Sequence, residues 1–196
     1  DDLTISQNSF NKNPLTIDLN GHTLTFSSAT LVNQSDLVIE DNSSSSNGKI
    51  VGSGSFVIQN GNSTITTANL VINSGTIENS AYYGIRNYGT ITINGGTITS
   101  PQYTVYNQNS FVMNDGLIYG TVGMAYQNAN NSTMEMHGGE IKSNSTDRAV
   151  NLNFNSTAIM FDGKITATNG SNGHGGVGVT AFKDSSFTIK GGNIEG

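Results

Sequence analysis

The feature that most limits what this chain can fold into is a short motif, glycine-any residue-isoleucine, that recurs along the sequence. Successive isoleucines of the motif lie 27, 21, 20, 23, 24 and 29 residues apart. A recurring period of about 20–50 residues indicates a solenoid or another repeat array, because each repeat forms one unit of a stack. The glycines of the motif are Gly48, Gly75, Gly96, Gly116, Gly139, Gly163 and Gly192, with a looser copy at Gly21.

Each motif is preceded by a segment in which apolar and polar residues alternate. Around Ile91 and Ile93 the alternating partners are Thr and Asn, and this period of two is typical of a β-strand. A coil of about 20 residues cannot bury its own apolar side chains, but stacking on the next coil buries them and pairs the two backbones. We therefore predict an all-β solenoid of about eight coils, with the motif isoleucines stacked in parallel register at roughly 4.8 Å spacing.

Glycine and asparagine are abundant and are expected at the corners between strands. Glycine allows a positive φ and a close approach of neighbouring backbones. Asparagine also suits corners, and its side-chain amides can form stacked ladders along a solenoid. The variable spacing of the motif indicates corner loops of different length, of which the longest lie at residues 41–48 and 169–178.

The chain divides into two segments by pattern. Residues 1–14 are mostly polar apart from Leu3, Ile5 and Phe10, and we interpret them as an N-terminal cap over the open edge of the first coil. Residues 15–196 form the repeat domain. Because the last copy of the motif is followed directly by the end of the chain at Gly196, we expect the native stack to continue beyond it.

The start of the repeat domain, LTIDLNGHTL at residues 15–24, resembles the first coil of repeat regions in bacterial cell-surface adhesins. The repeat as a whole resembles the right-handed parallel β-helix of the pectin-lyase-like fold. The resemblance implies a right-handed solenoid. It implies no single activity, because the fold is shared by lyases, hydrolases, phage tailspikes and adhesins.

Composition excludes several classes of function. The net charge is −6 and the only arginines are Arg86 and Arg148, so a basic face for nucleic acid is not expected. No apolar run reaches the roughly 18 residues of a membrane span, so membrane insertion is not expected. The absence of cysteine excludes disulfides and thiol chemistry. We expect an extracellular, cell-surface protein that is attached through other domains outside this chain.

Catalytic residues are not predicted. Gly173-His174-Gly175 resembles a motif of polygalacturonases, but the only Asp-Asp pair, Asp1-Asp2, lies at the terminus, and a glycosidase needs two carboxylates at the scissile bond. A polysaccharide lyase or glycoside hydrolase that acts on acidic polysaccharide is the alternative function.

No metal ion or cofactor is predicted either. Asp115 and Asp162 occupy equivalent corners two coils apart, roughly 10–15 Å, which is too far for one ion. The three histidines lie at different phases of the repeat, so a shared metal is not expected. Structural Ca²⁺ is the alternative for the acidic corners.

The tyrosines indicate a binding surface. All seven lie within residues 82–126; counting along the repeat places Tyr83 in one column with Tyr103, and Arg86 in another with Tyr106. A tyrosine offers a flat apolar ring and a hydroxyl, which suit sugar rings and protein partners alike. A structural ladder, or a column that points into the core, is the alternative. The predicted ligand-binding residues are Tyr82, Arg86, Tyr103, Tyr106 and Tyr126, the last placed by the count in the column of Tyr83.

The sequence therefore predicts a non-enzymatic binding module, the β-helical part of a bacterial adhesin. Its partner would be a host or environmental glycan or glycoprotein, held on the long lateral face of the solenoid. A structural spacer that only projects other domains is the third interpretation.

Overall fold

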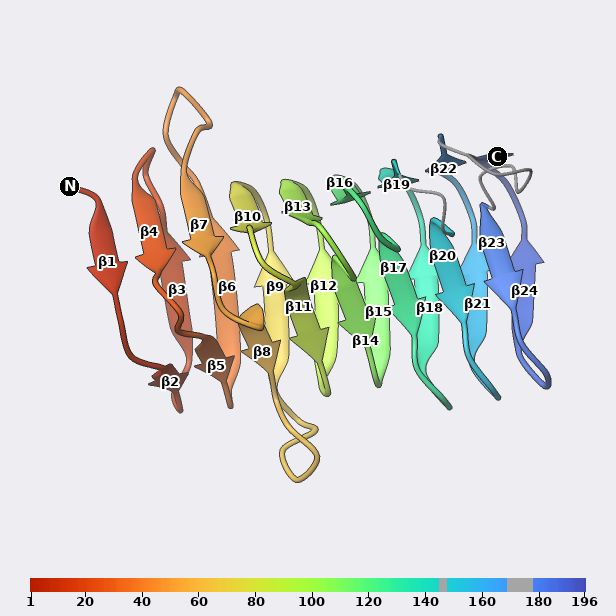
Figure 1. Ribbon diagram of the computed structural model, residues 1–196, viewed down its shortest axis with the longest axis horizontal. Helices are drawn as coiled ribbons and strands as arrows, with labels where there is room; N and C mark the ends of the chain where they lie inside the picture. Colours follow the sequence, from red (N-terminus) through yellow and green to blue (C-terminus); the bar gives the residue numbers. More distant parts are fainter. Residues whose placement is uncertain (145–147, 169–177) are drawn as a thin grey trace.

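The computed structural model describes residues 1–144, 148–168 and 178–196, and within these ranges the chain forms strands and turns but no helix. Three sheets run along an elongated stack, with the two termini at opposite ends (Figure 1). Every pair of neighbouring strands is parallel, and each coil contributes one strand to each sheet. The predicted all-β solenoid is confirmed, and the number of described strands in each sheet, eight or nine, is close to the eight coils expected. Its right-handedness stays a prediction.

The strands follow one another around the stack in the order sheet A, sheet B, sheet C. Sheet A contains β1 (Leu3–Ile5), β4 (Thr23–Phe26), β7 (Lys49–Gly52), β10 (Thr76–Asn79), β13 (Thr97–Ser100), β16 (Leu117–Gly120), β19 (Glu140–Ser143), β22 (Lys164–Ala167) and β25 (Asn193–Glu195). Sheet B contains β2 (Ser9–Asn11), β5 (Leu31–Asn33), β8 (Phe56–Asn60), β11 (Tyr83–Asn87), β14 (Val105–Asn107), β17 (Tyr126–Asn128), β20 (Val150–Leu152) and β23 (Val179–Ala181). Sheet C contains β3 (Leu15–Asp18), β6 (Asp36–Glu40), β9 (Asn69–Ile72), β12 (Thr90–Ile93), β15 (Ser110–Met113), β18 (Thr133–Met136), β21 (Thr157–Met160) and β24 (Ser186–Ile189).

The motif isoleucines form the predicted column inside sheet A. Ile77 pairs with Ile50 on one side and with Ile98 on the other, and the same register continues to Ile194. From Ile50 to Ile165 these side chains are almost completely buried. Burying each one removes apolar surface from water and contributes about 1.5–3 kcal/mol, so the column supplies much of the energy that holds the coils together.

Glycines of the motif are required by the corners that precede the strands of sheet A from β10 to β25, where each has a positive φ. Gly96 has a φ of 84°, in the left-handed region that side chains disfavour. A Cβ atom added there would lie 2.5 Å from the carbonyl oxygen of Gly75 in the coil below. The glycine therefore allows both the turn and the close stacking of successive corners.

A second column inside the solenoid is polar. Its members are the asparagines that end strands of sheet B, and each Nδ2 donates to the Oδ1 of the next, at distances of 2.7–2.8 Å. All are buried, with at most 8% of their surface exposed. The column ends at β20, where Leu152 takes the place of asparagine. We call it the inner ladder; it consists of Asn11, Asn33, Asn60, Asn87, Asn107 and Asn128.

Residues 1–14, interpreted from the sequence as a cap, contain the first strands of two sheets. β1 pairs with β4 and β2 pairs with β5, so this segment continues the stack by one coil. Leu3, Phe10 and Leu15 of that coil remain exposed. Leu3 and Leu15 occupy inward positions, paired with Leu24 and Leu37, whereas Phe10 lies in the outward column of sheet B.

Two corner loops project from opposite sides of the stack in Figure 1, one between β6 and β7 and one between β8 and β9. The first is fastened by the carboxylate of Asp41, which accepts hydrogen bonds from the backbone N–H of Gly21 (2.8 Å) and Gly48 (2.7 Å). Burial raises the pKa of Asp41, but the hydrogen bonds donated to the carboxylate together hold it below its ordinary value. The second long loop that the sequence predicted, residues 169–178, lies almost entirely outside the described residues.

Candidate functional site

The outer face of sheet B brings most of the predicted site residues together. Arg86 of β11 pairs with Tyr106 of β14, as the repeat phase predicted. Along the strand, outward and inward positions alternate, so Arg86 and Tyr106 lie on the outer face while Ile85 and Val105 are buried inside. Both outer side chains are partly exposed.

Stacked aromatic rings lie beside this pair. Tyr83 packs between Phe56 of the coil before and Tyr103 of the coil after, with ring centroids 5.2 and 5.3 Å apart and nearly parallel planes. Tyr82 stands edge-on to Tyr83 at 4.5 Å and is 40% exposed. Burial, followed by the neighbouring tyrosines, raises the pKa of Tyr83 to about 12, so the Tyr83 hydroxyl is neutral at physiological pH.

Arg86 is surrounded by rings. Its Cζ atom lies 5.3 Å from the ring centroid of Phe56, 4.9 Å from that of Tyr88 and 5.8 Å from that of Tyr106. These are cation–π distances, which hold the guanidinium against the aromatic surface. Among the described residues no carboxylate forms an ion pair with Arg86, and its Nε has no hydrogen-bond partner. The side chain therefore organises the aromatic cluster from within.

Tyr126 does not share this face. The register pairs Tyr126 with Val105 and Val150, both inward positions, instead of placing it in the column of Tyr83 and Tyr103. Tyr126 is fully buried, its hydroxyl donates to Asn128 Oδ1 at 2.6 Å, and burial raises its pKa well above the ordinary value. The sequence prediction was wrong because Tyr126 lies eight residues after Ile118 whereas Tyr103 lies five after Ile98. The corner between β16 and β17 is only one residue longer than the corner between β13 and β14, so Tyr126 falls two positions after the phase of Tyr103, on an inward position.

A shallow hollow, which sequence reasoning missed, borders the cluster. Its volume is about 490 Å³, and it is lined by Tyr106, Gln108, Ala129, Asn130 and Asn153. These residues follow or belong to β14, β17 and β20, three successive coils, and four of them lie at the corner between sheets B and C. The signal in the sequence was the asparagine that ends the sheet B strands from β2 to β17, because the residue after it occupies this corner.

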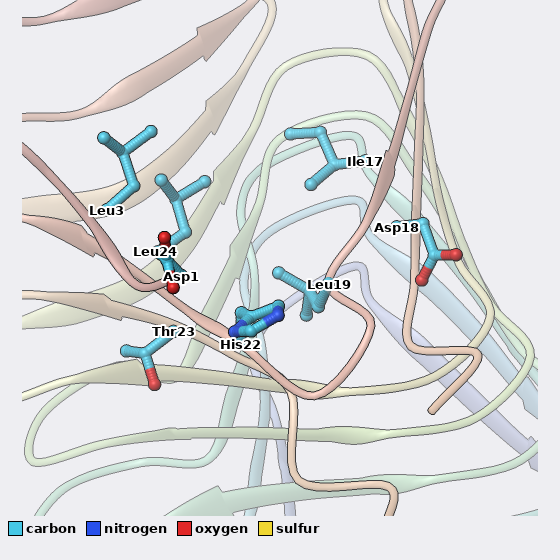
Figure 2. Close-up of a pocket in the computed structure, with 8 residues that line it drawn as sticks. All are labelled: Asp1, Leu3, Ile17, Asp18, Leu19, His22, Thr23 and Leu24. Carbon is cyan, nitrogen blue, oxygen red and sulfur yellow. The ribbon is translucent and has the colours of Figure 1, made fainter. Parts of the chain in front are cut away.

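A second pocket lies at the N-terminal end of the stack. It has a volume of about 250 Å³. Figure 2 shows His22 beside Leu19, with Leu3, Leu24 and Ile17 around the opening. These are side chains of the first two coils, far along the axis from the tyrosines, and the only titratable groups lining the pocket are those of Asp1, Asp18 and His22.

A cluster of side chains that could hold a metal ion is not found in the part of the chain that the structure describes. No group of three or more His, Asp or Glu side chains converges there. Asp115 and Asp162 each accept a hydrogen bond from the N–H of the glycine that follows, at 2.7 Å, at separate corners. The motif around His174 lies outside the described residues. Within those residues, no helix is long and apolar enough to cross a membrane.

Comparison with known proteins identifies no relative of this chain. No protein-family model, curated protein or solved structure is significantly similar to the chain.

Proposed function

We propose that this protein is a non-enzymatic binding module that holds a glycan or glycoprotein on the outer face of sheet B. The single observation that supports the proposal is the partly exposed aromatic cluster around Arg86, bordered by a hollow lined with amide side chains. We further propose a role in adhesion at a bacterial cell surface, with the chain attached through domains outside it.

The chemistry of the cluster fits a sugar-containing ligand. A tyrosine ring offers an apolar face for the C–H surface of a sugar, and its hydroxyl offers a hydrogen bond at the rim. Rings that already pack against one another lose little side-chain freedom when a ligand binds, which favours affinity. The stacked rings of Phe56, Tyr83 and Tyr103 extend over three successive coils, so a long chain-like ligand can make weak contacts with several coils at once.

A glycan and glycoprotein array, probed with the whole chain, tests the proposal. We expect binding to be at least about tenfold weaker in Tyr106→Ala and in Arg86→Ala, since the first removes a ring and the second removes the group that the rings pack around. Tyr119→Ala is the matched control, because Tyr119 is a partly exposed tyrosine on sheet A, beside Lys142. Thermal unfolding of each variant separates loss of binding from loss of fold.

Three outcomes contradict the proposal in different ways. Binding that survives both substitutions would place the ligand elsewhere. Release of reducing ends or unsaturated products from an acidic polysaccharide would favour the alternative of a lyase or hydrolase. An array on which nothing is retained would favour a structural spacer.

A further inference from the structure

We propose that the hollow beside Tyr106 is a subsite for one uncharged sugar unit of the ligand. The inference rests on the proposed glycan-binding function. It specifies which part of the surface contacts the sugar and which class of sugar that part binds. It is carried by the origin of the hollow, by the free amides that line it, and by the lack of charge among its lining residues.

The hollow exists because a small residue interrupts a column of larger ones. The residue after each sheet B strand donates its backbone N–H to a carbonyl one coil back: Gln108 to Asn87 at 2.8 Å and Ala129 to Asn107 at 2.7 Å, with Asn153 following in the same way. These residues therefore stack in register at the corner between sheets B and C. Ala129 lies between the longer side chains of Gln108 and Asn153, and its missing atoms leave the floor of the hollow open.

A change in corner length forms the rim. The corner between β14 and β15 contains two residues, 108–109, whereas the corner between β17 and β18 contains four, 129–132. The longer turn is fixed by Asn131, which has a φ of 63°, and by Ser132, whose Oγ donates to the carbonyl of Ala129 at 2.6 Å. Asn130 therefore projects from a rigid turn into solvent at the edge of the hollow.

The lining groups suit hydroxyls that carry no charge. The side chains of Gln108 and Asn130 make no hydrogen bond within the described residues, so their amides can both donate and accept. Asn153 Oδ1 is fixed by Asn151 at 2.9 Å, which leaves the Asn153 amide hydrogens to donate. Paired donors and acceptors match neighbouring hydroxyls of a sugar, and no lining side chain is charged to balance a carboxylate or sulfate.

Tyr106 connects the subsite to the aromatic cluster. Arg86 precedes Tyr106 in the outer column of sheet B, and Gln127 follows it on the side of the later coils, where the residues of the hollow lie. A ligand in the hollow thus reaches Tyr106 from the side that Arg86 does not occupy. The arginine acts on the site through the ring it supports.

Filling the hollow is the sharpest test. Ala129→Gln introduces at position 129 the same side chain that Gln108 presents one coil earlier in the column, so we expect the fold to tolerate it. Because the new side chain fills the hollow, the affinity for neutral oligosaccharides should fall at least about tenfold. Asn130→Ala removes one amide from a rim residue and should weaken binding roughly three- to tenfold. Asn114→Ala is the control, because Asn114 is an exposed asparagine at a different corner and should leave binding unchanged. The probes are matched neutral and carboxylated oligosaccharides, measured by titration calorimetry on the intact chain.

The outcomes separate this inference from the proposed function. Selective binding of neutral oligosaccharides that Ala129→Gln and Asn130→Ala both weaken supports the subsite. Binding that both variants leave intact but Tyr106→Ala removes overturns the subsite and keeps the aromatic face. Binding restricted to the carboxylated probes overturns the uncharged class. If neither class of probe binds the unmodified chain, the subsite and the glycan-binding proposal fail together.

Discussion

The solenoid contains two columns of asparagine amides that share one geometry and differ in surroundings. The inner ladder runs through the buried ends of the sheet B strands, with N–O distances of 2.7–2.8 Å. The outer ladder, Asn73, Asn94 and Asn114, follows the ends of sheet C strands in solvent, with distances of 2.8–2.9 Å. Because water can replace a lost partner only at the outer ladder, the comparison shows that burial, more than bond length, decides what an amide ladder contributes.

The inner ladder also fastens the corners. Asn87 Nδ2 donates to Asn107 Oδ1 and to the carbonyls of Gly89 and Ser110, while Asn87 Oδ1 accepts from Asn60 and from the N–H of Gly89. One side chain therefore satisfies groups of its own coil and of the coils on either side. In the outer ladder Asn94 bonds only to the amides of Asn73 and Asn114, and Asn73 donates in addition to the exposed carboxylate of Glu40.

The largest effect is expected at the centre of the inner ladder. Asn87→Ala removes five hydrogen bonds and leaves several buried groups without a partner, so we expect a loss of about 3 kcal/mol in the free energy of unfolding. Urea unfolding followed by circular dichroism measures it. A loss below about 1 kcal/mol would mean that the ladder is not dry or not formed.

The matched substitution in the outer ladder should cost far less. Asn94→Ala removes the bonds to Asn73 and Asn114, but water satisfies both neighbours, so we expect a change within about 0.5 kcal/mol. The same urea titration applies. If the two alanine variants lost equal stability, the distinction between buried and exposed ladders would be wrong.

The sequence predicted the interior better than the surface, for a physical reason. Gly96 and its positive-φ counterparts mark a corner that favours glycine, so the motif fixes the column of isoleucines from β7 to β25, while Leu3 and Leu24 occupy the same column in the first two coils. The sequence indicated that asparagine amides can form stacked ladders, and the structure shows which asparagines form them. The predicted phase of Tyr126 was wrong because its distance from the motif isoleucine exceeds that of Tyr103 by three residues, whereas the corner lengthens by only one.

The hollow could not be predicted from any single residue. It depends on Ala129 being smaller than its neighbours in the stack and on a corner that lengthens from two residues to four between adjacent coils. Both are differences between repeats, and a search for what the repeats share passes over them. Aligning the coils on the terminal asparagines of sheet B, rather than on the motif isoleucines, would have placed Tyr126 inside and exposed the small residue at position 129.

The distance between spin labels tests the stacked architecture most directly. The chain has no cysteine, so pairs introduced for labelling are unique. Val38, Glu135 and Thr188 belong to one outward column of sheet C, with Glu135 four coils and Thr188 six coils from Val38. Double electron–electron resonance is measured on two spin-labelled double variants, Val38→Cys/Glu135→Cys and Val38→Cys/Thr188→Cys. At roughly 4.8 Å per coil, the backbone separations should be about 19 and 29 Å. Two distances that did not differ by about 10 Å would contradict the parallel, in-register stack.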